Sequence, residues 1–217
     1  MPELRDYQRS AIDKIRNYFA KGKKNVLLVA PTGSGKTVIA SSMIDQALSK
    51  GKSCLFVAHR RELVMQCSRK LADFRVNHGV LMANKSETEE AKVQVASVQT
   101  FTARKDRDDF VKPQADLVIL DEAQNVSPMQ IKTLMTRISD NCKMIMQGDL
   151  SQCDKFKTNG VTNYEKSGFY DVWFRLQGVE GVEHMAFSRD DCIRHPLVKR
   201  ILKTYEDEHE IDLVNKS

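Results

Sequence analysis

Residues 26–37, VLLVAPTGSGKT, constrain the fold of this chain more than any other segment. The apolar run at residues 26–30 is typical of a buried parallel strand, and a helical pattern at residues 36–48 follows a glycine-containing turn. A loop that joins a strand to a helix in this way can wrap its backbone N–H groups around a phosphate. The segment therefore predicts a phosphate-binding loop in an α/β protein.

The alternation of strand and helix patterns continues along the chain. Short apolar runs predict strands at residues 54–58, 93–96, 117–120 and 143–146, and helical periodicity predicts helices at residues 3–20, 61–74 and 128–138. Parallel strands connected by helices form a sheet with helices on both faces. We therefore expect one large α/β domain with a mostly parallel sheet, for which 217 residues suffice.

The charge of the chain is unevenly distributed. Residues 1–110 contain 20 Lys and Arg against 12 Asp and Glu, whereas residues 111–217 contain 14 against 17. A basic first half suits a polyanionic partner such as nucleic acid, although an ordinary solvated surface would show the same excess. The five cysteines lack metal-ligand spacing, and the sequence shows neither a signal-peptide core nor an apolar run of about 20 residues. We expect a cytoplasmic protein without a membrane partner.

The residues of the predicted loop suit a nucleoside triphosphate. Gly33 and Gly35 let the backbone turn its N–H groups inward, Lys36 is expected to neutralise phosphate oxygens, and the Thr37 hydroxyl is expected to bind Mg²⁺. The loop residues expected to bind the nucleotide are Pro31, Thr32, Gly33, Ser34, Gly35, Lys36 and Thr37.

Two carboxylates follow the predicted strand at residues 117–120. Ligands bind at the carboxyl ends of the strands in such sheets, where Asp121 and Glu122 would lie. Asp121 is expected to hold Mg²⁺ through water, and Glu122 to polarise the water that attacks the γ-phosphate. An Asp-Glu pair alone also fits a solvated strand end, but together with the loop it predicts an ATP-hydrolysing enzyme.

Residues 4–124 resemble the first RecA-like domain of superfamily 2 helicases and translocases, on the segments LRDYQ, APTGSGKT, LFVAHRREL, VQVASVQTF and LVILDEAQ. The resemblance implies a RecA-like P-loop NTPase fold. It also implies that Gln8 reads the adenine base through its amide, and that Arg60, Ser97 and Gln99 contact a nucleic-acid backbone. An exposed helical glutamine, and a strand leading into a capped helix, are the structural alternatives.

Residues 118–205 resemble the C-terminal part of the PhoH family of P-loop ATPases, on DEAQNVSPMQIKTLMTRI, MIMQGDLSQCD, KSGFYD and DDCIRHPLVKRIL. The resemblance implies that Gln152 senses the γ-phosphate. It leaves Arg194 either as an arginine finger supplied to a neighbouring subunit or as a structural residue at a helix start.

The two resemblances predict one RecA-like ATPase domain over residues 1–205, with a helicase-like half (1–124), a PhoH-like half (125–205) and an acidic tail (206–217). A natural recombination and an engineered chimera both account for this pattern.

The function expected from these motifs is ATP hydrolysis coupled to the binding or remodelling of RNA or DNA, as in an oligomeric helicase or translocase. A homo-oligomeric ring would let Arg194 complete a neighbour's site, whereas a monomer would hydrolyse ATP slowly. A nucleotide-gated nucleic-acid-binding switch with little turnover is the alternative. A kinase-type enzyme is a weaker third hypothesis, because no segment resembles an acceptor-binding lid.

Overall fold

The computed structural model describes residues 4–73, 75–82, 85–87, 91–104, 114–137, 141–150, 152, 157–158, 161–162 and 166–187. In chain order its elements are α1 (Asp6–Ala20), β1 (Asn25–Val29), α2 (Lys36–Leu48), β2 (Cys54–Ala58), α3 (Arg61–Asp73), β3 (His78–Met82), β4 (Lys85–Glu87), β5 (Val93–Ser97), α4 (Val98–Arg104), β6 (Leu117–Asp121), a 3-10 turn (Ala123–Asn125), α5 (Pro128–Arg137), β7 (Lys143–Gly148), β8 (Lys157–Thr158), β9 (Val161–Thr162), α6 (Gly168–Arg175) and β10 (Val182–Ala186).

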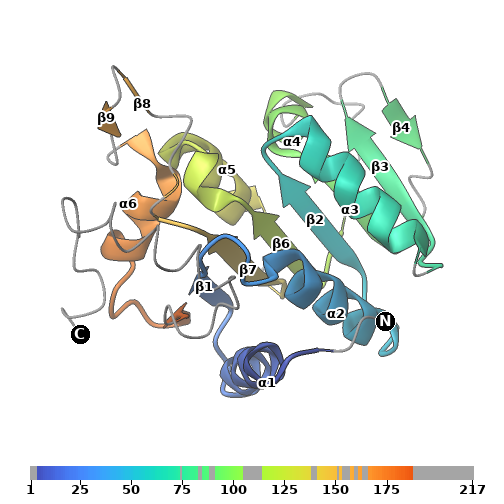
Figure 1. Ribbon diagram of the computed structural model, residues 1–217, viewed down its shortest axis with the longest axis horizontal. Coiled ribbons are helices and arrows are strands. Elements are labelled where there is room, and N and C mark those ends of the chain that lie inside the picture. Colours follow the sequence, from blue (N-terminus) through green and yellow to red (C-terminus); the bar gives the residue numbers. More distant parts are fainter. Residues whose placement is uncertain are drawn as a thin grey trace, which may run out of the picture.

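One eight-stranded sheet forms the centre of the molecule, with the strand order β10-β1-β7-β6-β2-β5-β3-β4 (Figure 1). The pairs along the sheet are parallel except for the antiparallel pair of β3 with β4 at one edge. The expected α/β fold with a mostly parallel sheet is therefore confirmed.

Helices cover both faces of the sheet because the strands present apolar side chains on both faces. In β1, Val26 and Leu28 pack into the core shared with α1, α2 and α3, whereas Leu27 packs into the core shared with α4, α5 and α6. In β2, Phe56 faces the first core and Val57 the second. This two-sided burial explains why the strands are continuous apolar runs and not alternating ones.

The order of the strands determines where a ligand can bind. β7 lies between β1 and β6, so the loop after β1 and the acidic residues after β6 lie on either side of the end of β7 (Figure 1). All three strands are parallel, and their carboxyl ends meet at the same edge of the sheet. This edge contains the candidate site.

The bounds of the predicted strands and helices lie within three residues of the observed ones. The strands β3, β4, β8, β9 and β10 and the helix α6 were not predicted, and α4 corresponds to the capped helix given as the structural alternative for residues 93–101. No helix of the described part of the chain is long and apolar enough to cross a membrane.

Candidate functional site

The loop between β1 and α2 has the backbone shape that a polyphosphate requires. Gly33 and Gly35 adopt φ values of 87° and 80°, in the left-handed region that favours glycine. A Cβ atom on Gly35 would collide with Nε2 of Gln8, so this position excludes a side chain for a second reason. Gly35 is also the N-cap of α2, which points its positive helix end at the loop.

Side chains of the N-terminal helix α1 form hydrogen bonds with this loop. The Tyr7 hydroxyl and Nε2 of Gln8 both donate hydrogen bonds to the carbonyl oxygen of Ser34, at 2.8 and 3.2 Å. Oε1 of Gln8 accepts from the backbone N–H of Arg5 at 3.1 Å, and the Gln8 side chain is buried. The oxygen and the nitrogen of this amide therefore both bond to the protein backbone. The role of Gln8 in reading adenine stays a prediction.

Polar groups of the loop fit a phosphate chain. Nζ of Lys36 donates to the carbonyl oxygen of Ala30 at 2.8 Å, so the ammonium group lies against the loop. The buried hydroxyl of Ser34 has no hydrogen-bond partner among the described residues, and the Thr37 hydroxyl, at the start of α2, also has none. An ammonium group, unpaired hydroxyls and a helix N-terminus are the groups that bind phosphate and its metal in such loops.

Asp121 ends β6 as a buried carboxylate. Its Oδ1 accepts hydrogen bonds from Nε2 of Gln147 and from the backbone N–H of Glu122, each at 3.0 Å. Its Oδ2 accepts none from any described residue. Burial raises the pKa of Asp121, whereas the two hydrogen bonds and the charge of Lys36 lower it. The carboxylate therefore has a free oxygen close to a cationic loop, which suits a hard cation such as Mg²⁺.

Glu122 follows in a strained conformation, with φ at 49°. Left-handed backbone at a residue other than glycine costs about 1–3 kcal/mol and is concentrated at functional sites. The side chain is half-buried, and its Oε2 lies 3.4 Å from Nδ2 of Asn125. Burial and then the charge of Asp121 raise the pKa of Glu122, while the nearby charge of Arg60 lowers it. A carboxylate with a raised pKa is a stronger base towards water.

The end of β7 joins the two halves of the site. The backbone N–H of Ala30 donates to the carbonyl oxygen of Gly148, and the N–H of Thr32 donates to Oδ2 of Asp149, both at 2.8 Å. The Thr32 hydroxyl donates to Oε1 of Gln152 at 2.7 Å. Gln152 therefore lies beside the loop, although its role as a γ-phosphate sensor stays a prediction.

The N-terminus of α6 contacts the segment that follows β6. Oε1 of Gln124 accepts from the backbone N–H of Asp149 at 3.1 Å, and the carbonyl oxygen of Gln124 accepts from the Ser167 hydroxyl at 2.9 Å. Ser167 is the N-cap of α6, and Gly168 approaches the backbone of Ser127 so closely that a Cβ atom would lie 2.7 Å from it. The segment KSGFYD therefore anchors the loop that carries Glu122.

The residues expected to contact nucleic acid lie at or just beyond the carboxyl ends of the neighbouring strands β2 and β5. Ala58 pairs with Ser97 in the sheet, so Arg60 and Gln99 emerge at the same edge, and both side chains are exposed. Ser97 differs from them, because it is buried and its hydroxyl caps α4 by accepting from the N–H of Thr100 at 3.1 Å.

The structure thus brings together the loop residues Pro31 to Thr37 with Gln8, Asp121, Glu122 and Gln152, and it places Arg60 and Gln99 beside them along the edge of the sheet. Arg194 and the acidic tail lie outside the described residues. Asp149, which the segment GDLSQ also places beside the nucleotide, bonds to the loop through Thr32. The supporting residues that the sequence analysis missed are Tyr7, Gln124, Asn125, Gln147 and Ser167. The sequence contained a signal for one of these, Gln147, which is a polar residue near the carboxyl end of an apolar run.

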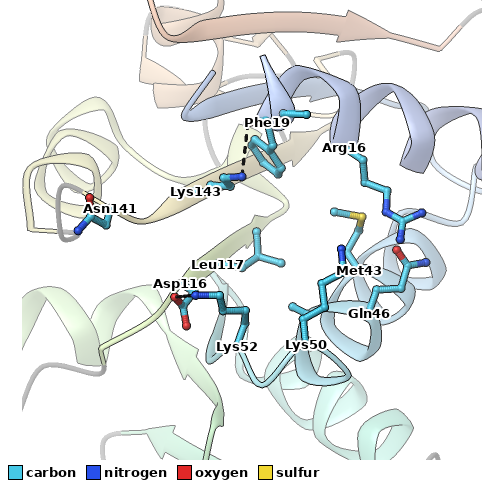
Figure 2. A pocket seen from close by; sticks show the side chains of 12 residues that line it. Arg16, Phe19, Met43, Gln46, Lys50, Lys52, Asp116, Leu117, Asn141 and Lys143 are labelled. Atoms are coloured by element: carbon cyan, nitrogen blue, oxygen red, sulfur yellow. Dashed lines mark hydrogen bonds and ion pairs between the residues drawn. The ribbon is translucent and has the colours of Figure 1, made fainter. Parts of the chain in front are cut away.

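A cavity of about 540 Å³ lies at the other end of the strands (Figure 2). Its wall includes Phe19 of α1, Met43 of α2 and Leu117 at the start of β6, with the ion pair of Lys52 and Asp116 at 2.9 Å beside it (Figure 2). The length of a five-residue strand, roughly 16 Å, separates this cavity from the loop between β1 and α2. The cavity is therefore distinct from the candidate nucleotide site.

A scan against family models matches residues 1–151 to the family described as "Type III restriction enzyme, res subunit". Among curated proteins, a PhoH-like protein of Bacillus subtilis is 32% identical over 214 residues, covering 89% of this chain and 62% of the relative. A PhoH-like protein of Synechocystis is 30% identical over 194 residues, covering 82% of this chain and 55% of the relative. The chain thus spans about three fifths of the length of these relatives, and the similarity to them extends beyond residues 118–205.

Among solved structures, the helicase domain of Pyrococcus furiosus Hef is similar with a TM-score of 0.59 and 22% sequence identity. The similarity covers 87% of this chain and 39% of that one, and at this identity it supports the fold alone.

Proposed function

This chain belongs to the family described as the res subunit of Type III restriction enzymes and is related to the PhoH-like proteins, and on that premise we propose that it hydrolyses ATP in a manner coupled to nucleic acid. The observation that carries the proposal is the edge formed by β1, β7 and β6. There a phosphate-binding loop and a buried carboxylate are connected through a single intervening strand.

The proposed reaction assigns one task to each group. The N–H groups of the loop and Lys36 hold the phosphates of ATP, and Gln152 contacts the γ-phosphate after releasing the Thr32 hydroxyl. Glu122 accepts a proton from the attacking water and orients it. Arg194, if supplied by a neighbouring copy in a ring, stabilises the negative charge that develops during transfer.

Thr37 and Asp121 are the residues that would hold Mg²⁺, because they offer a hydroxyl and a carboxylate oxygen to which no described residue bonds. When bound, the ion neutralises charge on the β- and γ-phosphates.

Nucleic acid is proposed to bind along the carboxyl ends of β2 and β5. Arg60 and Gln99 are exposed there, and the charge of Arg60 reaches Glu122, so the two functions share one edge. Ser97 contributes mainly by capping α4, since its hydroxyl already bonds to Thr100. The basic first half of the chain supports a polyanionic partner.

The test is phosphate release from ATP, measured with and without single-stranded RNA and DNA, alongside equilibrium binding of a fluorescent ATP analogue. Glu122→Gln should keep nucleotide binding and lose hydrolysis, whereas Lys36→Ala should lose binding as well. Wild-type turnover by Glu122→Gln would refute the assigned base.

The same experiment addresses the nucleotide-gated switch. Tight ATP-dependent binding of nucleic acid, with slow hydrolysis that nucleic acid does not change, would support the switch. Stimulation of hydrolysis by nucleic acid would support a helicase or translocase.

A further inference from the structure

Gln147 is a fully buried amide near the end of β7, where it follows the apolar residues Met144 to Met146. Its neighbours in β7, Ile145 and Met146, pack into the two hydrophobic cores. Gln147 instead donates a hydrogen bond from Nε2 to Oδ1 of Asp121 at 3.0 Å. The strand register explains this contact. Leu120 of β6 pairs with Met146 of β7, so the residues that follow them, Asp121 and Gln147, lie side by side.

The amide of Gln147 is only half satisfied. Its Oε1 is buried and has no hydrogen-bond partner among the described residues. An apolar side chain of similar volume would avoid this cost, so packing does not explain a glutamine here. The reverse orientation of the amide would place its oxygen against the carboxylate, which repulsion disfavours. The residue is therefore present for the hydrogen bond that it donates to Asp121.

This hydrogen bond restricts which oxygen of Asp121 is available. The backbone N–H of Glu122 and the side chain of Gln147 both bond to Oδ1, and no described residue bonds to Oδ2. A carboxylate held by two donors on one oxygen has a fixed side-chain rotamer and presents the other oxygen.

We propose that Gln147 is a positioning residue, which holds Asp121 so that Oδ2 is kept for the metal ion of the nucleotide complex. The inference rests on the proposed ATPase function and assigns a residue on which metal binding depends. Partners of metal-binding carboxylates contribute to metal affinity by orienting them, and their loss typically lowers that affinity by about 10–100-fold.

The experiment measures equilibrium affinity for a fluorescent ADP analogue with and without Mg²⁺, in wild type, Gln147→Met and Ile145→Val. Gln147→Met keeps the volume and removes the donor. Ile145→Val is the matched control, since Ile145 lies on the same face of β7 and touches the core instead of the carboxylate. The affinity without Mg²⁺ and the melting temperature of the ligand-free protein are recorded for each protein.

We expect Mg²⁺ to increase the affinity of the wild type, and we expect Gln147→Met to lose about 10–100-fold of that increase while its affinity without Mg²⁺ stays the same. Ile145→Val should melt at a lower temperature but keep the full effect of Mg²⁺. An unchanged Mg²⁺ effect in Gln147→Met, or an equal loss of affinity with and without Mg²⁺, overturns the proposal.

A second variant covers the case in which Gln147→Met does not fold. Gln147→Asn keeps a polar amide that is one methylene too short to reach Asp121, so it should lose the Mg²⁺ effect as well; a full Mg²⁺ effect in Gln147→Asn refutes the proposed hydrogen bond. A wild type that binds no nucleotide would instead refute the proposed function itself, so the two failures are distinguishable.

Discussion

Gly148, at the end of β7, offers a sharp test of the packing beneath the site. A Cβ atom built on this residue would lie 2.7 Å from Oε1 of Gln124 and 2.8 Å from the ring of Phe169. Both of these side chains are buried. The φ angle of Gly148 is not in the left-handed region, so alanine is acceptable to the backbone and the expected effect of Gly148→Ala is steric.

The magnitude follows from two contributions. Overpacking a buried site costs about 1–3 kcal/mol, and displacing Gln124 from the N–H of Asp149 costs a further 0.5–1.5 kcal/mol or so. The sum is about 1.5–4.5 kcal/mol, which lowers the melting temperature of a domain of this size by about 3–18 °C. Because Asp149 also holds Thr32 of the phosphate-binding loop, nucleotide affinity should fall together with stability.

The assay is thermal and urea unfolding of wild type, Gly148→Ala and Gly51→Ala, with nucleotide affinity measured on each. Gly51 has a φ of 74° and no atom within 4 Å of a built Cβ, so Gly51→Ala should cost about 1–2 kcal/mol through backbone strain and leave nucleotide affinity unchanged. Adding Phe169→Leu to Gly148→Ala should relieve the clash and give a less than additive loss. A Gly148→Ala protein within about 0.5 kcal/mol of wild type would refute the reasoning.

Three further predictions concern charged residues of the site. Asp121→Asn should stabilise the ligand-free protein at neutral pH, because burial raises the pKa of Asp121 above its ordinary value of 3.8 and the charged form is the one penalised. The advantage should be complete above the raised pKa and vanish as the pH falls towards 3.8, and melting curves from pH 4 to pH 8 would check it. Arg60→Ala should weaken the binding of single-stranded nucleic acid, measured by fluorescence anisotropy at several salt concentrations. The slope of log K against log salt concentration should fall by the amount expected for about one phosphate contact. An unchanged slope would show that Arg60 does not contact the nucleic acid. If Arg194 acts in a neighbouring subunit, mixing inactive Arg194→Ala with inactive Lys36→Ala should restore part of the ATPase rate, whereas no recovery would favour a structural role.

Elements with strong local signals could be predicted from the sequence. The helix Lys36–Leu48 and the strand Cys54–Ala58 were predicted with their observed bounds, because an apolar run or a glycine-containing loop delimits each. β10 was missed, because its sequence VEHMA mixes charged and apolar residues, as suits a strand at the edge of the sheet. Helix α6 was missed as well, although its N-cap is a local signal in which the Ser167 hydroxyl accepts from the N–H of Tyr170. The close approach of Gly168 to Ser127 could not be predicted from any local pattern.

In the candidate site, too, contiguous motifs could be predicted from the sequence, whereas contacts between residues far apart in the chain could not. The loop and the Asp-Glu pair could be recognised, because each is a contiguous motif. Their connection could not, since it depends on the insertion of β7 between β1 and β6 and on hydrogen bonds such as that of Thr32 to Asp149, 117 residues later. The motif predicts adenine reading by Gln8, but it does not predict that the amide bonds to the backbone of Ser34 and Arg5.

The position of β1 in the sheet has a consequence for how the protein is made. Both strands that pair with β1, β7 and β10, lie more than a hundred residues later in the chain. While the ribosome synthesises the first 140 residues, β1 and its glycine-containing loop therefore have no native strand to bond with, although β2, β3, β5 and β6 can already assemble. An apolar strand that is exposed and unpaired during synthesis is prone to aggregation, and chaperones bind such segments. The loop after β1 is therefore translated well before the strands that fix its position in the sheet.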